Sequence, residues 1–286
     1  MEKRNLYPIG KAAEICKVSP RALRYYEEKG LIKPDEISSS RYRYYSADTL
    51  LLVQLIRYYI DEGFSLQDAE QLLRRDSFDV LEQSFQGQME KTQEQISLQH
   101  QRLDSMAAWH DLICEGRRVL RYRDDSITVR AIPASTYFYM EAEADLQDPY
   151  FASQIETEYF SHSKGNGHTM VDVGGAFYLY YESFQDRLNR SKMKVRLMQT
   201  LYPNAQSLHG TMEIPACEAV STYHIGTLDA INASYERAIR WAQERHIPLR
   251  RDACERYVLD ICSTSDENKY VTQILLPIQE EDSSRA

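Results

Sequence analysis

Hydrophobic and polar residues follow three successive patterns along the 286-residue chain. Residues 1–76 combine short apolar runs with residues that begin and end helices. Residues 77–120 carry a single narrow apolar stripe, and residues 121–280 contain short segments rich in Val, Ile and Tyr. The first two patterns predict short helices and one long helix, and the third predicts strands mixed with helices. We therefore expect an α+β protein with three domains at these boundaries.

The long helix is predicted because residues 77–115 contain no Pro and only one Gly, Gly87. Apolar or neutral residues recur at alternating steps of four and three, at Phe85, Met89, Thr92, Ile96, Gln99, Leu103, Met106, His110 and Ile113. This spacing is typical of a coiled coil, although Thr92, Gln99 and His110 make the stripe imperfect. An isolated helix would leave the stripe in water, so a partner helix is required. We expect His110 to pack in the stripe rather than to bind a ligand.

Residues 121–280 contain two similar halves. Ile132-Pro133-Ala134 opens the first half, and Ile214-Pro215-Ala216 opens the second. In each half the motif is followed by a strand pattern, a helical pattern and two further strand patterns. The repeat predicts a duplicated strand-strand-helix-strand-strand domain, with two antiparallel sheets and a groove between them. The segment 184–202 falls outside the repeat and is not placed by it.

The N-terminal stretch carries a helix-turn-helix pattern. Ser19 can accept a hydrogen bond from an unpaired amide at the start of a helix, and Pro20 suits the first helical position. Gly30 can end this helix, and another short helix precedes it. Two helices joined by a short turn predict a helix-turn-helix. Residues 31–34 and 42–45 can then pair as a hairpin, which would form a wing.

Net charge changes the functional expectation. The chain has a net charge of −9, but residues 1–45 hold ten Lys and Arg against six Asp and Glu, a net charge of +4 that leaves −13 for the remainder. A basic N-terminal segment on an acidic remainder is typical of a DNA-binding domain with a separate regulatory domain. The five Cys residues are scattered, and no apolar run is long enough to span a membrane. We therefore expect a cytoplasmic protein without a membrane partner.

The helix-turn-helix and wing resemble the DNA-binding domain of the MerR family of transcription regulators. The resemblance covers about the first 75 residues and rests on Val18-Ser19-Pro20-Arg21-Ala22-Leu23-Arg24-Tyr25-Tyr26-Glu27, Gly30-Leu31-Ile32 and Tyr42-Arg43-Tyr44-Tyr45-Ser46. In one departure, Ser40-Arg41 stand where the family usually has Asn-Gly or a similar pair before the second wing strand. The wing tip is therefore expected to use a different turn.

The resemblance implies a homodimeric transcriptional activator that binds promoter double-stranded DNA together with RNA polymerase. It implies that the long helix pairs antiparallel with its copy in a second subunit, and that the dimer bends and untwists the promoter. The residues expected to contact DNA lie in the helix-turn-helix and the wing: Lys11, Ser19, Arg21, Arg24, Tyr25, Tyr42 and Arg43.

The second half of the C-terminal repeat resembles the GyrI-like effector-binding domain, most strongly over residues 212–278. Tyr223-His224-Ile225-Gly226, Glu255-Arg256-Tyr257 and the stretch from Thr272 to Ile278 carry this resemblance. MerR-type regulators with this domain form a multidrug-sensing branch, which implies a small lipophilic, cationic effector. In that branch the glutamate of Glu-x-Tyr is the central drug-binding residue, and Glu255 occupies this position.

A ligand-binding site at Glu255 also fits the strand pattern. Alternation places Glu255 and Tyr257 on one face with Leu259, and a carboxylate on an apolar face is costly to bury unless a cation meets it. Tyrosine rings attract delocalised cations. The candidate ligand-binding residues are therefore Glu255, Tyr137, Tyr180, Tyr223 and Tyr270. Alternatively, Glu255 lies at an exposed strand end, paired with Arg256 or Arg251, and the tyrosines belong to an ordinary core.

Two other functions remain open. Some GyrI-like domains are hydrolases, and Glu255 with Tyr257 could act as a general base and a proton donor. Metal or redox sensing would use Cys residues, but Cys114 is expected to have no Cys or His neighbour at ligand spacing. Cys254 and Cys262 are expected at opposite ends of one strand. We expect no enzymatic activity, no catalytic residues, no metal site and no cofactor.

Overall fold

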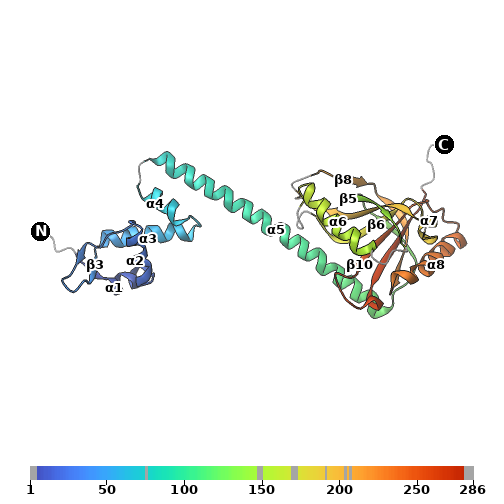
Figure 1. Cartoon of the computed structure of the whole chain (residues 1–286), viewed down its shortest axis with the longest axis horizontal. Coiled ribbons are helices and arrows are strands. Elements are labelled where there is room, and N and C mark those ends of the chain that lie inside the picture. Colours follow the sequence, from blue (N-terminus) through green and yellow to red (C-terminus); the bar gives the residue numbers. More distant parts are fainter. Residues whose placement is uncertain are drawn as a thin grey trace. The chain divides into compact units, whose positions relative to one another are not determined.

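The structure, a computed structural model, describes residues 5–74, 77–146, 151–168, 173–190, 192–202, 205 and 208–279. The chain forms two compact units, Met1–Ile96 and Ser97–Ala286, hereafter the N-terminal and C-terminal units. The first contains mostly helices, and the second contains a large sheet with helices packed against it (Figure 1). The expected combination of helices and strands is confirmed.

The N-terminal unit is a helix-turn-helix with a small sheet. It consists of α1 (Ile9–Cys16), α2 (Pro20–Glu28), α3 (Ala47–Asp61), α4 (Leu66–Arg74) and the beginning of α5, with β1 (Tyr7–Pro8), β2 (Glu36–Ile37) and β3 (Arg43–Tyr45). The Ser19 hydroxyl accepts a hydrogen bond from the Ala22 amide at 3.1 Å, so the predicted helix start is confirmed. Leu23, Val53 and Ile56 are fully buried in the core that joins these helices.

The wing differs from the expected hairpin. β3 pairs with β2 and β1, so its partner strands are Glu36–Ile37 and Tyr7–Pro8 rather than residues 31–34. The reason is hydrophobic, because Ile32 is buried in the core and Leu31 packs against it. At the wing tip Arg41 adopts a φ of 60°. A left-handed conformation costs energy in a residue with a Cβ atom, so the tip uses a turn without the glycine that usually relieves this strain.

α5 (Phe78–Tyr122) is one helix of 45 residues, which confirms the predicted long helix. It begins in the N-terminal unit, where Phe85 packs in a small aromatic cluster, and it ends in the C-terminal unit. Three residues of its apolar stripe are more than half exposed: Met89, Leu103 and Met106. The described part of this chain therefore leaves much of the stripe uncovered.

The C-terminal unit is built on one antiparallel sheet of eight strands. These are β4 (Thr128–Ile132), β5 (Ser135–Ala144), β6 (Val173–Tyr181), β7 (Met193–Leu201), β8 (Thr211–Ile214), β9 (Cys217–Ile225), β10 (Ala253–Leu259) and β11 (Val271–Pro277). Their order across the sheet is β4-β9-β11-β10-β6-β7-β5-β8. The helical segments are α6 (Phe151–Gly165), α7 (Phe184–Leu188), η1 (Leu228–Ala230), α8 (Ile231–Glu244) and η2 (Glu267–Lys269). The previously unplaced stretch 184–202 thus contains α7 and β7.

The predicted duplication is present, but the two halves share a single sheet. The first half contributes β4, β5, α6, β6 and β7, and the second contributes β8, β9, α8, β10 and β11. The first strand of each half pairs with the other half, because β4 pairs with β9 and β8 pairs with β5. At the centre β10 pairs directly with β6. The expectation of two sheets separated by a groove is therefore wrong, since these two strands satisfy each other's backbone hydrogen bonds.

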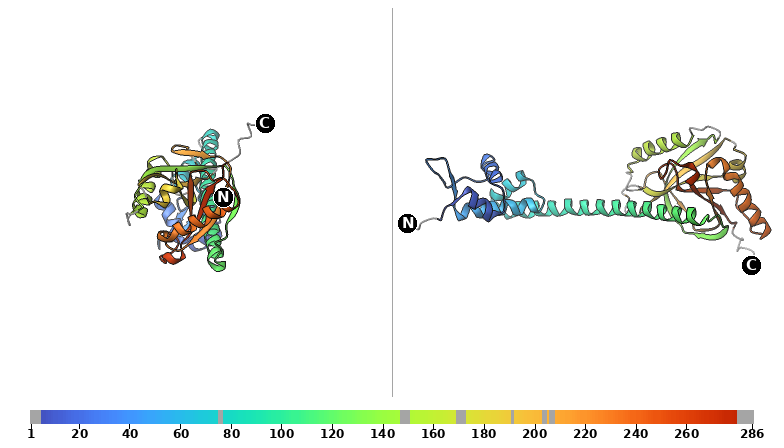
Figure 2. Two further views of the ribbon diagram at one scale, coloured as in Figure 1. Left: turned by 90° about the vertical axis from the view of Figure 1, so that its right-hand side faces the viewer. Right: turned by 90° about the horizontal axis from the view of Figure 1, so that it is seen from below.

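The two faces of the sheet carry different helices. On one face, hereafter the α6/α8 face, α6 packs over β5, β6 and β7, and α8 packs over β9, β10 and β11. On the other, the α5 face, the end of α5 packs through Leu112 and Val119. Figure 2 shows α5 and α6 on opposite sides of the sheet. The central strand β10 is therefore covered by different elements on its two sides.

Candidate functional site

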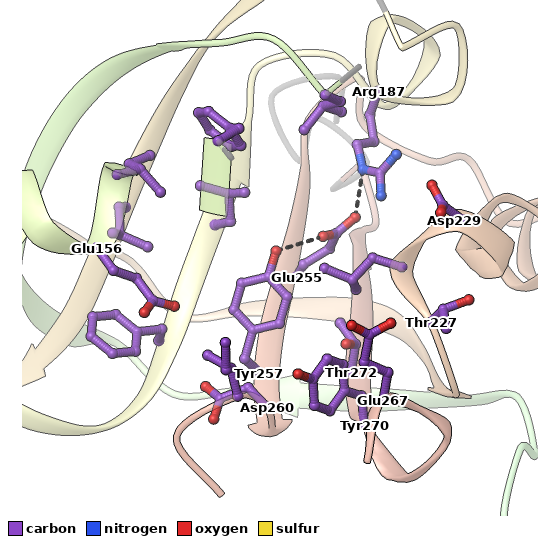
Figure 3. A pocket seen from close by; sticks show the side chains of 18 of the residues that line it. Glu156, Arg187, Thr227, Asp229, Glu255, Tyr257, Asp260, Glu267, Tyr270 and Thr272 are labelled. Carbon is purple, nitrogen blue, oxygen red and sulfur yellow. Dashed lines mark hydrogen bonds and ion pairs between the residues drawn. The ribbon is translucent and has the colours of Figure 1, made fainter. Parts of the chain in front are cut away.

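A cavity of about 530 Å³ lies on the α6/α8 face of the sheet (Figure 3). Residues of α6, α7 and η1 surround it, together with side chains from the central strands β6 and β10. Most lining side chains are apolar or aromatic: Leu146, Phe151, Ile155, Phe177, Leu179, Tyr181, Leu197, Leu228, Tyr257, Leu259, Ile261 and Tyr270. A cavity of this size and composition is typical of small-molecule sites.

Glu255 of β10 lines this cavity with a carboxylate that is hydrogen-bonded on both oxygens. Oε1 accepts bonds from Arg187 Nε at 2.7 Å and from the Tyr235 phenol at 3.0 Å. Oε2 accepts bonds from the Tyr181 and Tyr257 phenols, each at 3.1 Å. The side chains of Glu255 and Arg187 are 1% and 4% exposed. One cation and three neutral donors thus hold a buried carboxylate at the centre of the sheet.

The protonation of this cluster follows from its burial. Burial and the negative charge of Glu255 raise the pKa of Tyr181, Tyr235 and Tyr257 well above the ordinary value, so the three phenols stay neutral. Burial alone would lower the pKa of Arg187, but the Glu255 carboxylate raises it above the ordinary value. The carboxylate and the guanidinium therefore form a buried ion pair without net charge.

The remaining charges around the cavity are mainly acidic. Apart from the buried ion pair, four carboxylates and one guanidinium line it: Glu156, Asp229, Asp260, Glu267 and Arg190. Arg190 is already paired with Asp229 at 3.2 Å. Burial raises the pKa of Glu156, and the charge of Asp260 adds to this rise. An acidic cavity with aromatic walls attracts cations rather than anions.

The structure brings one of the four predicted tyrosines, Tyr270, into the cavity. The other three lie on the α5 face: Tyr137, Tyr180 and Tyr223. Glu255 pairs in register with Leu179 of β6, and alternation along β6 turns the next residue to the opposite face. The tyrosines that do contact the carboxylate come from β6, β10 and α8.

Sequence reasoning missed Arg187, the cation that meets Glu255. The alternative in which Glu255 is exposed and paired with Arg256 or Arg251 does not hold, because Glu255 is fully buried. Arg187 belongs to α7, in the stretch that the repeat could not place. One signal was available, since a buried carboxylate requires a cationic partner. The sequence could not choose among the several arginines of this domain.

The α5 face holds a second ion pair, directly behind the first. Arg256 follows Glu255 on β10 and donates two hydrogen bonds to Glu115 of α5, at 2.8 and 2.9 Å. The Tyr223 phenol donates to the same carboxylate at 2.7 Å. Burial alone would raise the pKa of Glu115, but the bonds from Arg256 hold it below the ordinary value. This pair fastens β10 to the end of α5.

The candidate DNA-contacting residues of the helix-turn-helix are largely exposed. Arg21, Arg24 and Tyr25 of α2 all face solvent, and no described residue forms an ion pair with either arginine. Lys11 of α1 is exposed and paired with a neighbouring glutamate at 2.9 Å. The Ser19 hydroxyl is used as the helix cap. The surface of α2 therefore presents two unpaired cations beside an aromatic ring, which suits phosphates and base edges.

The two candidate residues of the wing have different surroundings. Tyr42 is exposed near the wing tip. Arg43 is half-buried, and its Nε donates to Glu27 of α2 at 2.7 Å, a bond that raises the pKa of Arg43. Arg43 thus connects the wing to α2, and only part of its guanidinium remains available to a partner.

A metal site finds no support in the part of the chain that the structure describes, where no group of three or more His, Cys, Asp or Glu could hold an ion. The expectation that Cys114 has no His neighbour is wrong. Its Sγ lies 3.6 Å from His110 Nε2, because residues four apart share one face of a helix. No described helix is both long and apolar enough to cross a membrane.

Two protein families match this chain. Residues 7–76 match the family described as MerR HTH family regulatory protein. Residues 126–279 match the family described as GyrI-like small molecule binding domain. The first match covers the helix-turn-helix and wing, and the second covers the eight-stranded sheet with its cavity.

Individual relatives match over shorter or more divergent stretches. The HTH-type transcriptional activator mta of Bacillus subtilis (strain 168) is 24% identical over 170 residues, which is 58% of this chain and 64% of that protein. The HTH-type transcriptional regulator HmrR of Sinorhizobium medicae (strain WSM419) is 38% identical over 65 residues, 23% of this chain and 44% of that protein. The chain therefore covers less than two thirds of either relative. Among solved structures, the cryo-EM structure of the EcmrR–DNA complex is 21% identical, with a TM-score of 0.46, over 96% of this chain and 100% of that one.

Proposed function

We propose that this chain, which belongs to the MerR family of transcription regulators and carries a GyrI-like small molecule binding domain, is a ligand-responsive transcriptional activator. The N-terminal unit binds promoter double-stranded DNA, and the C-terminal unit binds a small lipophilic cation. The observation that carries this proposal is Glu255, a carboxylate buried in a 530 Å³ cavity in a chain that begins with a helix-turn-helix. We place the protein in the cytoplasm, where the promoter lies.

DNA binding is supported by the surface of α2. Arg21 and Arg24 are exposed beside Tyr25, and a second helix of a helix-turn-helix usually enters the major groove. Tyr42 lies on the wing, where it can reach the DNA backbone beside the major groove. Cations of this kind position a protein on phosphates, while contacts to base edges specify the sequence.

A homodimer is supported by the exposed stripe of α5. Leu103 and Met106 are 60% and 62% exposed in the single chain, and water contact with such a stripe is unfavourable. An antiparallel copy of α5 would cover it with the same residues. The dimer would then place two α2 helices on two half-sites related by a two-fold axis.

The mechanism we propose is deformation of the promoter. The dimer bends and untwists the DNA so that RNA polymerase can engage both promoter elements. The energy of this deformation depends on the DNA sequence, so the deformation itself contributes to promoter specificity. An effector changes transcription only through a difference in affinity for the two states of the protein–DNA complex. Such coupling free energies are typically about 1–3 kcal/mol.

A lipophilic cation is the effector class that the cavity supports. Aromatic and apolar side chains form most of its lining, and its carboxylates outnumber its guanidinium groups. Rings of tyrosine and phenylalanine attract a delocalised cation by about 0.5–2 kcal/mol each. The geometry does not support the alternative that the domain is a hydrolase. The oxygens of Glu255 already accept four hydrogen bonds, so no lone pair is left for Glu255 to act as a general base.

DNA binding is tested by Arg24→Ala in a gel-shift titration over a range of salt concentrations. Affinity should fall, and the salt dependence should become shallower, because one fewer phosphate contact releases fewer counterions. Arg74→Ala is the matched control, since Arg74 is exposed on α4 and paired with Glu70. Equal losses in both variants would remove α2 from the interface.

The dimer is tested by Leu103→Glu combined with Met106→Glu, followed by light scattering. Two charges in the stripe should convert the dimer to a monomer. Ser97→Glu combined with Leu98→Glu adds the same charges on the other side of α5 and should leave the dimer intact. A monomer in the unmodified protein would contradict the two-half-site arrangement.

The ligand class is tested by calorimetry on the full-length protein with benzamidinium, an aromatic cation, and benzamide, its neutral analogue. Benzamidinium should bind more tightly. Equal binding of both compounds would indicate a generic apolar cavity, and failure of every aromatic cation would contradict the proposed effector class. Chemical conversion of a ligand during the measurement would indicate a hydrolase.

A further inference from the structure

The cavity already contains a cation, the guanidinium of Arg187. Its Nε donates to Glu255 Oε1 at 2.7 Å, and its Cζ lies 5.5 Å from the ring centroid of Tyr181 and 5.8 Å from that of Tyr235. Both Arg187 and Glu255 line the same cavity. A charge-assisted hydrogen bond and flanking aromatic rings are the features that a cationic ligand would need. The chain's own arginine therefore occupies the site at which an effector would meet the carboxylate.

This occupancy changes what Glu255 can offer to a ligand. The carboxylate and the guanidinium form a buried pair without net charge, so a second cation next to the pair is attracted by one charge and repelled by the other. In addition, every hydrogen bond to the two carboxylate oxygens is already made. A cation gains the full attraction of Glu255 only when the guanidinium has moved away.

We propose that Arg187 is an internal counter-ion that competes with the effector, and that a cationic effector binds by displacing the guanidinium of Arg187 from Glu255. This inference rests on the proposed ligand-binding function of the cavity. It adds a specificity-determining residue, a movement of α7 and a narrower class of ligand.

The surroundings of Arg187 permit the displacement. Arg187 belongs to α7, a helix of five residues between β6 and β7, rather than to the sheet itself. Asp229 lines the same cavity with a side chain that is 89% exposed. Figure 3 shows Arg187 and Asp229 at the same end of the cavity. Asp229 is paired with Arg190, but its exposure shows that this end of the cavity is open to solvent. A guanidinium that leaves Glu255 toward this end is therefore hydrated, and its charge does not stay buried without a partner.

The bond that Arg187 makes also narrows the ligand class. A guanidinium presents planar N–H donors to a carboxylate and stacks on aromatic rings. An aromatic amidinium or guanidinium compound replaces both interactions. A quaternary ammonium compound replaces the charge and the ring contact but has no N–H to give to Oε1. We expect the effector to be a flat aromatic cation that carries N–H donors.

The decisive variant is Arg187→Met, which removes the counter-ion while it keeps most of the side-chain length. The three phenols that donate hydrogen bonds to the carboxylate of Glu255 remain in place. The cavity then holds a carboxylate without a cation. Benzamidinium should bind at least tenfold more tightly to Arg187→Met than to the unmodified protein, whereas a purely structural arginine predicts weaker binding when it is removed.

The controls separate this effect from general damage. Arg196→Met is matched, since Arg196 Nε also bonds a carboxylate, Glu141 at 2.9 Å, and its Cζ lies 5.5 Å from the Tyr180 ring, but outside the cavity. The affinity of Arg196→Met for benzamidinium should equal that of the unmodified protein. The double variant Arg187→Met with Glu255→Gln should not show the increase in benzamidinium affinity expected for Arg187→Met alone. Benzamide should bind both single variants alike.

The experiment is calorimetry on the full-length protein with benzamidinium, phenyltrimethylammonium and benzamide. In the unmodified protein benzamidinium should bind about tenfold more tightly than phenyltrimethylammonium, because the latter lacks N–H donors. If Arg187→Met does not fold, the Nε–H signal of Arg187 in the NMR spectrum of the unmodified protein gives a second test. This signal should shift and exchange faster when benzamidinium saturates the cavity.

The outcomes separate the inference from the proposed function. Cation binding by the unmodified protein, together with unchanged or weaker binding by Arg187→Met, would overturn the displacement and leave the proposed effector class intact. An Arg187 Nε–H signal that is unaffected at saturation would have the same meaning. Absence of cation binding in both proteins would overturn the proposed function and the inference together.

Discussion

The two faces of β10 bury oppositely charged residues one position apart, and each meets its partner in a different way. Glu255 faces the cavity and accepts a hydrogen bond from Arg187 of the short helix α7. Arg256 faces α5 and donates two hydrogen bonds to Glu115. The first pair borders empty space of about 530 Å³, whereas the second lies beneath a packed helix.

This difference decides which pair can exchange its partner. On the α5 face the contact is tight at Gly116, where a Cβ atom would lie 2.3 Å from Leu259 Cγ. Leu259 borders the cavity and also packs with Leu112 and Val119 of α5, because the strand register shifts between Tyr257 and Leu259. The pair of Arg256 and Glu115 therefore joins the sheet to α5. On the cavity face a ligand can take the place of a protein side chain. Burial alone therefore does not tell whether an ion pair holds the fold together or takes part in ligand binding. The space beside the pair separates these two roles.

The largest effect is expected from Arg256→Met. It leaves Glu115 largely buried without a cation, so the free energy of unfolding should fall by about 3 kcal/mol. Trp109 and Trp241 both lie in the C-terminal unit, so urea unfolding followed by Trp fluorescence reports this unit. Addition of Glu115→Gln should restore part of the loss. A change below about 0.5 kcal/mol would show that the pair is not structural, and the contrast between the faces would fail.

The second largest effect is expected from Gly116→Ala. The added methyl group has no room against Leu259, so stability should fall by about 2 kcal/mol, as measured by thermal unfolding with circular dichroism. Gly87→Ala is the matched control on the same helix, where a Cβ atom meets nothing within 4 Å. Alanine there should be neutral or stabilise α5 by about 0.5–1 kcal/mol. Equal effects of both substitutions would mean that the α5 face is loosely packed.

The third effect is on the free energy of ligand binding, not of unfolding, and is expected from Glu255→Gln. Loss of the carboxylate should weaken benzamidinium binding by more than tenfold, or about 1.4 kcal/mol, and leave benzamide binding nearly unchanged. Glu141→Gln removes a carboxylate from the same sheet outside the cavity and serves as the control. If both variants lose cation affinity equally, the attraction comes from the general charge of the domain and not from the cavity.

The smallest effect is expected from mild acid. The pKa of Glu115 is held below its ordinary value in the folded protein, so its carboxylate contributes stability that is fully present above the unfolded pKa of about 4.3. This contribution is lost as the pH falls through the lower folded pKa, because protonation breaks the bonds to Arg256. Urea midpoints between pH 7 and pH 3 should fall less steeply in Glu115→Gln. If the urea midpoints of both proteins fall equally with pH, Glu115 is not the source of the loss of stability in acid.

Local signals were sufficient for α2, for α5 and for the duplication in the C-terminal unit, but they did not predict that the two halves share one sheet. Ser19 and Pro20 predicted the start of α2, and the recurring stripe predicted α5, because capping and helical periodicity act within a few residues. The repeated Ile-Pro-Ala motif predicted the duplication. Alternation along β10 placed Glu255 and Tyr257 on one face, as the structure has them. The expectation that Leu259 follows the same alternation is wrong, because the strand register shifts between Tyr257 and Leu259 and Leu259 packs against α5.

The tertiary structure alone decided which side chains meet. Arg187 reaches Glu255 across 68 residues of sequence, and Glu115 reaches Arg256 across 141. Alternation assigns residues to the two faces of one strand, but it does not say which strand lies beside it or in which register. The pairing of β10 with β6 placed Leu179 beside Glu255 and turned Tyr180 away from it. Local chemistry therefore determined the elements and the carboxylate, and the register of the sheet determined the cation that it meets.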